Sequence, residues 1–262
     1  MKKLCLLAVA SVATSYSALA TVYFSDNFDG YANGNLVGQG PWQQTGAVAT
    51  SPVQANNGAV SLGNTGQDIY APLISPTTIN DGSSLYIGVD VTVTAAQSAG
   101  DYFLHWTPTV GNSSIFQERL FAKSSGGGYV LGYTSTTGTA VYGTTVLNFG
   151  TDYRLVLNYT GVPGLANDTF ALYVNPTDTT TEGNNTAYMT GGFVGTGSET
   201  NAVAGINLRQ GTAANAPSET VDNLDMATTF GEAAVFTVPE PSAAALGILG
   251  GLAGLVAWKR RK

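Results

Sequence analysis

The strongest structural signal in this chain is an alternation of apolar and polar side chains with a period of two. Between Leu85 and Val93 every second residue is a branched aliphatic one, and the residues between them are mostly polar or small. Segments 153–159 and 170–174 alternate in a similar way. Because successive side chains of a β-strand point to opposite faces, this period predicts half-buried strands rather than helices.

Further candidate strands follow one another at short intervals along the chain. Turn signals rich in Gly, Asn and Asp separate them, such as Asn-Asn-Gly at 56–58 and Asn-Asp-Gly at 80–82. The further candidates are 22–28, 59–62, 102–106, 115–123, 129–133, 144–149, 202–209 and 219–228. About a dozen short strands without a convincing helix predict one all-β domain, a sandwich or a barrel, over residues 21–230.

The N-terminus has the features of a Sec signal peptide at residues 1–20. Met-Lys-Lys precedes an apolar run at 4–13, and Ala18 and Ala20 form an A-x-A cleavage site. We expect the Sec translocon to export the chain and signal peptidase to cut after Ala20. An uncleaved anchor is disfavoured because the apolar run is shorter than the ~20 residues of a membrane span. Cys5 is the only cysteine and would leave with the signal peptide, so no disulfide is expected.

The C-terminus combines a proline-containing spacer, an apolar stretch and a basic end. Its three parts are a spacer at 231–241 that includes Pro239, Glu240 and Pro241, a transmembrane helix at 242–258 and a basic cytoplasmic tail at 259–262. The apolar stretch is nearly long enough to cross the hydrocarbon core of a bilayer, and the positive-inside rule keeps the basic end in the cytoplasm. Together with the signal peptide, this pattern predicts a translocated body held at the inner membrane.

The Pro-Glu-Pro sequence, the short apolar helix and the basic cluster, in this order, resemble the PEP-CTERM sorting signal of Gram-negative bacteria. The resemblance implies an exosortase as partner, a membrane protease that would cut near Pro239, Glu240 and Pro241. The body would then reach the cell envelope, the cell surface or the exopolysaccharide of the extracellular matrix. The alternative is an ordinary tail anchor that stays in the membrane.

The arrangement of the strands resembles the concanavalin A-like lectin and glucanase jelly roll. The segments that carry the resemblance are 26–31, the consecutive hairpin of 153–159 and 170–176, and 221–225. The resemblance implies a β-sandwich in which the first and last strands pair. It supports a fold but does not determine a function, because unrelated activities share such folds.

The distribution of charge disfavours nucleic acid as a partner. The formal net charge of the chain is −7, but six of its ten basic residues lie within four residues of an end. Residues 21–238 contain sixteen acids and four bases, a net charge of −12. Binding to phosphate backbones needs clustered Lys and Arg, which this body lacks.

Residues suited to catalysis are few. His105 is the only histidine, and its place in an alternating strand favours a structural role. Glycosidases need two carboxyl groups about 5–10 Å apart, and the Glu-x-Asp-x-Glu and Glu-x-Asp-x-x-Glu patterns of related glucanases are absent. Glu118 stands alone, and Glu219, Asp222 and Asp225 are spaced by three, which alternates faces on a strand. We therefore expect a non-enzymatic protein, with a secreted glycan-active hydrolase as the alternative.

A structural calcium ion is a further hypothesis. Asp26 and Asp29 lie near the first strand, and Asp222 and Asp225 lie near the last, so pairing of these strands would bring their oxygen atoms together. A bound divalent cation would also relieve the negative charge of the body. The alternative is that these acids are simply solvated turn and strand-end residues.

Polysaccharide binding would depend on aromatic side chains, on which sugar rings stack. Trp42 lies in a loop with several Gln and Gly residues, and Tyr86 and Tyr173 occupy the polar phase of their strands. We therefore predict Trp42, Tyr86 and Tyr173 as glycan-contacting residues. The alternative is that these rings pack in the interior, since aromatic residues are common in strands.

Overall fold

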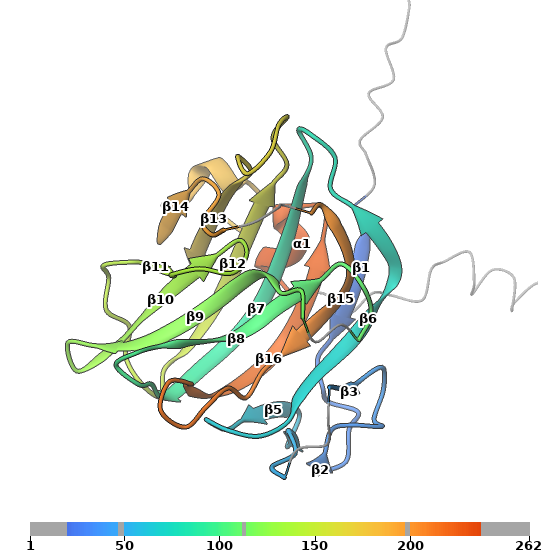
Figure 1. The fold of residues 1–262 in the computed structure, drawn as a ribbon, viewed down its shortest axis with the longest axis vertical. Helices are drawn as coiled ribbons and strands as arrows, with labels where there is room; N and C mark the ends of the chain where they lie inside the picture. Colours follow the sequence, from blue (N-terminus) through green and yellow to red (C-terminus); the bar gives the residue numbers. More distant parts are fainter. Residues whose placement is uncertain (1–19, 47–49, 112–113, 197–199, 237–262) are drawn as a thin grey trace, which may run out of the picture.

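The computed structural model of the chain describes residues 20–46, 50–111, 114–196 and 200–236. In these ranges the chain folds into two antiparallel β-sheets that lie face to face, with one short α-helix on the outside (Figure 1). The prediction of an all-β jelly-roll sandwich is confirmed.

The nine-stranded sheet forms one layer of the sandwich. In order across the sheet its strands are β14 (Met189–Gly191), β13 (Thr169–Val174), β12 (Asp152–Thr160), β7 (Ser84–Ala95), β16 (Ser218–Ala227), β5 (Ala59–Leu62), β4 (Gln54–Asn56) and β2 (Gly34–Asn35), and β1 (Val22–Asp26) pairs with β16. The predicted hairpin of 153–159 and 170–174 is present as β12 and β13, which are hydrogen-bonded neighbours.

The seven-stranded sheet forms the other layer. In order its strands are β11 (Val141–Tyr142), β10 (Gly128–Thr134), β9 (Gln117–Ser125), β8 (Asp101–Thr107), β15 (Ala202–Leu208), β6 (Asp68–Thr78) and β3 (Gln43–Thr45). The chain passes from this layer to the other between β6 and β7 and returns between β7 and β8. Such crossings place residues that are distant in sequence at the same end of the sandwich.

The alternation that starts at Leu85 determines which side of β7 faces the core. Ile87, Val89 and Val91 are each 1% exposed and belong to the single large hydrophobic cluster between the sheets. β7 pairs with β12 on one side and with β16 on the other, so these side chains lie near the middle of the layer. Their burial stabilises the fold by roughly 1.5–3 kcal/mol for each side chain.

The first and last strands of the body pair, as the jelly-roll resemblance implies. Val22 lies opposite Ala227 at the start of β1. Just before it, the backbone N–H of Thr21 donates to Oγ1 of Thr228 at 3.0 Å, and the N–H of Thr228 donates to the carbonyl of Thr21 at 3.0 Å. The folded body therefore begins directly after the predicted cleavage site at Ala20, and its two ends lie side by side.

The helix α1 (Phe230–Ala234) packs on the outer face of the nine-stranded sheet. Thr229 caps its N-terminus, because the Thr229 Oγ1 accepts a hydrogen bond from the N–H of Glu232 at 3.4 Å. Phe230, Ala233 and Ala234 are buried. The prediction that a spacer begins at residue 231 is therefore wrong for residues 231–234, because this helix has an apolar face that the sheet covers.

The predictions for the two ends of the chain lie outside the described residues. These are the signal peptide up to residue 19 with Ala18, the motif residues Pro239, Glu240 and Pro241, the helix at 242–258 and the tail at 259–262. Among the residues that the structure does describe, no helix is both long enough and apolar enough to cross a membrane. Ala20 is described and is exposed.

The carboxyl group of Glu219 lies among core residues of the sandwich. Glu219 on β16 is 3% exposed, and its cross-strand neighbours Leu62 and Val93 are core residues. Within the described ranges neither of its oxygens has a hydrogen-bond partner. Burial therefore raises the pKa of Glu219 well above its usual range and favours the protonated form of this group in the folded protein.

Replacing Glu219 by Gln should reduce the loss of stability at high pH. The folded protein keeps a proton that the unfolded chain releases above about pH 4.3, so the free energy of unfolding falls as pH rises from that value toward the folded pKa. Denaturant unfolding of the full chain at about pH 5 and about pH 8 should show that Glu219→Gln flattens this decline.

The exposed acid Asp81 provides the matched control. Asp81→Asn should have the same free energy of unfolding as the wild-type protein at both pH values, because a solvated carboxylate has little effect on the folding equilibrium. An unchanged pH dependence in Glu219→Gln would contradict the assignment of Glu219 as a buried, neutral acid.

Candidate functional site

Trp42 belongs to the core and is not available to a sugar. It is 0% exposed, and its ring lies 5.7 Å from both the Phe24 and the Phe28 ring. Its Nε1–H donates to Oδ2 of Asp26 at 2.8 Å, and the hydroxyl of Tyr31 donates to the same oxygen at 2.5 Å. The prediction that Trp42 contacts glycan is therefore wrong, because other side chains enclose the ring.

Tyr86 and Tyr173 are also covered. They are 8% and 7% exposed, and both rings make edge-to-face contacts with Phe230 of α1, at centroid distances of 6.0 and 5.3 Å. Their hydroxyls donate to the carboxylate of Glu182, at 2.8 and 3.0 Å. The two residues do occupy the outer face of the sheet, but α1 packs over that face. The prediction of two exposed tyrosines is wrong for this reason.

The structure does not assemble the predicted calcium ligands. Asp26 already accepts the hydrogen bonds from Trp42 and Tyr31, and Asp225 forms an ion pair with Arg154 at 2.8 Å. Across the described ranges, no group of three or more His, Cys, Asp or Glu residues is placed to hold a metal ion. The prediction that Asp26, Asp29, Asp222 and Asp225 bind calcium together is therefore wrong, because Asp26 and Asp225 already pair with donors of the protein itself.

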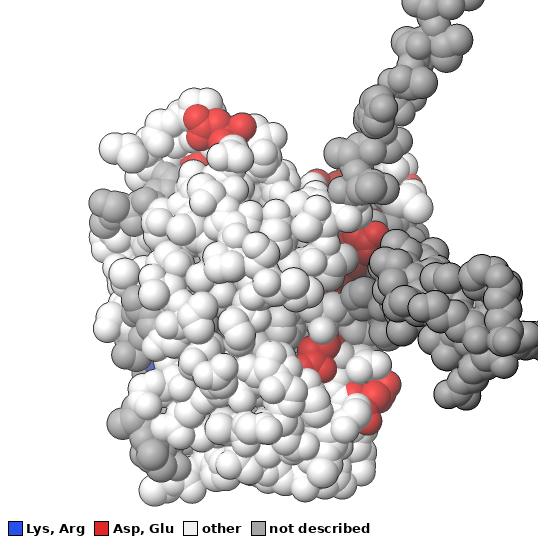
Figure 2. Space-filling view, turned by 90° about the vertical axis from the view of Figure 1, so that its right-hand side faces the viewer, with Lys and Arg blue, Asp and Glu red and all other residues white. Residues whose placement is uncertain are grey.

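The other two members of that set lie in an acidic region of the surface. Burial raises the pKa of Asp222 to about 6, and the negative charges of Asp90 and Asp29 contribute to the increase. Asp29 is exposed and accepts a hydrogen bond from Nδ2 of Asn27 at 2.9 Å. Figure 2 shows one side of the molecule on which acidic side chains form separate patches and basic side chains are almost absent.

His105 and Glu118 are both enclosed. His105 is 2% exposed and lies between the rings of Tyr102 and Phe116, at centroid distances of 5.3 and 4.9 Å. Burial lowers the pKa of His105 to about 3, so its imidazole is neutral. Glu118 is 3% exposed. Neither side chain is placed to exchange a proton with a substrate that arrives from solvent.

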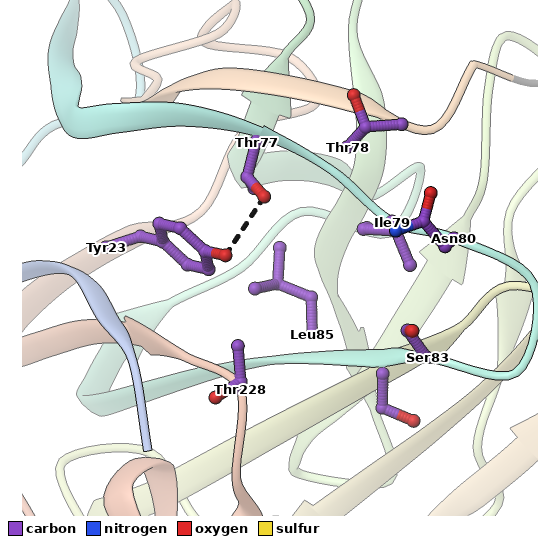
Figure 3. A pocket seen from close by; sticks show the side chains of 9 residues that line it. Tyr23, Thr77, Thr78, Ile79, Asn80, Ser83, Leu85 and Thr228 are labelled. Atoms are coloured by element: carbon purple, nitrogen blue, oxygen red, sulfur yellow. Dashed lines mark hydrogen bonds between the residues drawn. The ribbon is translucent and has the colours of Figure 1, made fainter. Parts of the chain in front are cut away.

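A small pocket opens between the two sheets at the end of the sandwich where the body begins and ends. We call it the hydroxyl pocket, and its volume is about 200 Å³. The residues that line it are Tyr23, Thr77, Thr78, Ile79, Asn80, Ser83, Ser84, Leu85 and Thr228. They come from β1, from the end of β6, from the β6–β7 turn, from the start of β7 and from the residue after β16. In Figure 3, Tyr23 and Thr77 lie on one side of this space and Asn80 and Ser83 on the other.

The lining of the hydroxyl pocket is polar but uncharged. Six of its nine residues carry hydroxyl groups, one carries an amide, and Ile79 and Leu85 are aliphatic. Oγ1 of Thr77 donates to the Tyr23 hydroxyl at 3.0 Å (Figure 3). The lining contains no Asp, Glu, His, Lys or Arg, so the pocket has hydrogen-bonding groups but no side chain suited to general acid or base catalysis.

None of the pocket residues is among the site residues predicted from the sequence. The sequence does contain a signal, because Thr77, Thr78, Asn80, Ser83 and Ser84 form a dense polar cluster between two strands. Such polar clusters are ordinary in turns. Nothing in the sequence indicates that β1 and the end of β16 lie beside this cluster and complete a cavity with it.

Comparison with known proteins concerns the two parts of the chain separately. Residues 237–262 match the model of the PEP-CTERM protein-sorting motif. The chain therefore carries this sorting motif, as the sequence predicts. No curated protein matches the chain in sequence.

Solved structures resemble the body. The globular domain of calreticulin from T. cruzi has a TM-score of 0.51 and 8% identity, and the match covers 92% of this chain and 100% of that one. Domain 4 of AbnA, a GH43 extracellular arabinanase from Geobacillus stearothermophilus in complex with arabinotriose, has a TM-score of 0.49, 13% identity and coverages of 82% and 99%. Lectin II from Ulex europaeus has a TM-score of 0.45, 14% identity and coverages of 79% and 100%. At these identities the calreticulin likeness shows the fold and nothing more.

Replacing Trp42 by Phe should weaken the fold without changing any glycan binding. The variant removes a buried hydrogen bond to a carboxylate, which is typically worth about 1.5–3 kcal/mol. Chemical denaturation should therefore show a lower free energy of unfolding. Tyr70→Phe is the control, because the Tyr70 hydroxyl donates to Gln43 at an exposed position. Loss of glycan binding with unchanged stability would support the original prediction for Trp42.

Proposed function

We propose that this chain is an exported protein that an exosortase sorts to the cell surface or extracellular matrix of a Gram-negative bacterium. In this proposal its body contacts polysaccharide without catalysing a reaction. The observation that carries the proposal is the PEP-CTERM motif, which starts at residue 237, directly after a folded body whose last helix ends at Ala234.

The position of the motif suits processing of a folded protein. The buried core is formed by residues that precede the motif, so removal of the C-terminal segment would leave the described core intact. Pro239 lies five residues beyond Ala234, and an extended chain covers at most about 18 Å over this length. The body would therefore stand close to the membrane while the tail is in place.

The polysaccharide part of the proposal is supported by the character of the hydroxyl pocket. Neutral hydroxyl and amide groups beside aliphatic surface are the chemistry with which proteins bind uncharged polyols. A secreted glycan-active hydrolase stays the alternative. It is disfavoured because Glu118 and His105 are enclosed and because the pocket lining has no carboxyl group.

Sorting predicts a specific change at the C-terminus. Mass spectrometry of the protein recovered from the cell surface should find a chain that ends near the Pro-Glu-Pro sequence. The double variant Pro239→Ala with Glu240→Ala should stay in the membrane with Lys262 present. Glu232→Gln, a change in α1 outside the motif, should be processed normally. An intact Lys262 in the wild-type surface fraction would contradict exosortase processing and favour a tail anchor.

Binding and hydrolysis can be separated with the full chain in detergent. We expect it to retain polysaccharides on a glycan array and to release no reducing ends from them over many hours. Release of reducing ends that is lost in Glu118→Gln would establish the hydrolase alternative. If the chain neither binds polysaccharides nor releases reducing ends from them, the polysaccharide part of the proposal is overturned and the sorting part stands.

A further inference from the structure

We propose that the hydroxyl pocket binds one neutral sugar residue, at the end or on a branch of a polysaccharide. This inference rests on the proposed function and names the class of ligand and the place where it binds. It follows from the size of the pocket, from its hydrogen-bonding groups and from its lack of charge.

The size limits the ligand to a single residue. Sites for drug-sized ligands have volumes of about 300–1,000 Å³, whereas this pocket holds about 200 Å³. The lining residues also come from the ends and turns of strands in both sheets, so the pocket lies at one end of the sandwich and not along the face of either sheet. A polysaccharide would therefore insert one residue, while the rest of the polymer stays outside.

Several polar groups of the lining are available to a ligand. The Tyr23 hydroxyl accepts from Thr77, so its own proton is free to donate to a ligand oxygen. In the same way, Oγ1 of Thr228 accepts from the N–H of Thr21 and keeps its own proton. Within the described ranges, the side chains of Asn80 and Ser83 make no hydrogen bond to protein. These groups come from opposite sides of the space, as Figure 3 shows for Tyr23 and Ser83.

The aliphatic residues of the lining, Ile79 and Leu85, can contact the C–H groups of a sugar ring. Leu85 is 1% exposed and Ile79 is 4% exposed, so both are fixed by the core and present only a small apolar surface. A sugar ring has C–H groups on its faces and hydroxyls around its rim. The pocket has the complementary arrangement, with fixed aliphatic side chains among hydroxyl and amide groups.

The electrostatic environment selects against charged sugars. The lining offers no Lys or Arg to a uronic acid and no carboxylate to an amino sugar. A uronic acid would in addition approach a body with a net charge of −12. Bringing either charge into the pocket would remove water without a compensating ion pair, which is costly.

The test uses saturation-transfer difference NMR with the full chain in detergent. The probes are the methyl glycosides of glucose, galactose, mannose and arabinose, with the methyl glycosides of glucuronic acid and glucosamine as charged comparators. We expect at least one neutral glycoside to bind, and both charged ones to bind at least about ten-fold more weakly. Tyr23→Phe and Ser83→Ala should each weaken the neutral ligand about three- to ten-fold, the effect of losing one hydrogen bond.

Two variants serve as matched controls. Tyr70→Phe removes a strand hydroxyl that also makes one hydrogen bond, but outside the pocket. Ser98→Ala removes an exposed serine in the β7–β8 turn, which lies at the opposite end of β7 from Ser84. Both should bind like the wild-type protein. All four variants should keep the wild-type melting temperature to within a few degrees, because each removes one hydroxyl at a partly or fully exposed position.

The outcomes separate this inference from the proposed function. If the glycan array shows binding but Tyr23→Phe and Ser83→Ala bind all ligands normally, the pocket assignment is overturned and the proposed function stands. If no glycan binds in either experiment, the pocket assignment and the polysaccharide part of the proposed function both fail.

Cleavage after Ala20 would place an ammonium group on Thr21 beside Thr228. Preferential binding of the glucuronide by the cleaved protein would therefore overturn the assignment of a neutral ligand.

Discussion

The structure depends on the pairing of β16 with three other strands. One edge of β16 pairs with β7, and the other pairs first with β5 and then with β1. A bulge between Asp222 and Asp225, where Asn223 has a φ of 46°, changes the phase of the strand. Val221 and Leu224 can therefore both face the core, while Asp225 reaches Arg154 on the outer face. Without this strand the first strand would have no partner and the hydroxyl pocket would lack two walls.

Few charges are present in this body, and several of them serve to hold elements together. Arg154 is the clearest case, since its guanidinium pairs with Asp225 at 2.8 Å and with Asp90 at 3.3 Å and also donates to the Ala233 carbonyl at 2.7 Å. It therefore fixes α1 to the nine-stranded sheet at the place where the chain leaves the body. Burial keeps the pKa of Asp225 high, at about 7, despite this pairing. Because this pKa lies above that of an unfolded aspartate, the contribution of Asp225 to the free energy of unfolding falls as pH rises from about 4 toward about 7.

The fold could be predicted from the sequence, whereas the site could not. The period-two pattern at 85–93 and the hairpin at 153–174 could be predicted because they depend on local backbone geometry. The pairing of the first strand with the last could be predicted from the resemblance to a known fold. Trp42 and Tyr86 show the limit of such reasoning, because an alternating pattern tells which face a residue occupies but not what covers that face. The Phe24 and Phe28 rings that pack against Trp42 and the helix that covers Tyr86 are tertiary contacts. The pocket depends in the same way on residues about 200 positions apart, Tyr23 and Thr228.

The pairing of the first strand with the last has a consequence for the timing of folding. Val22 meets Ala227 only after nearly the whole body has been synthesised, and contacts of such long sequence separation form slowly. If the chain is exported through a translocon, as its N-terminal sequence predicts, this delay would help it to stay unfolded in the cytoplasm, because its sandwich would not close early. In that case the same topology would let the body complete its fold only when its final strand had reached the far side of the membrane.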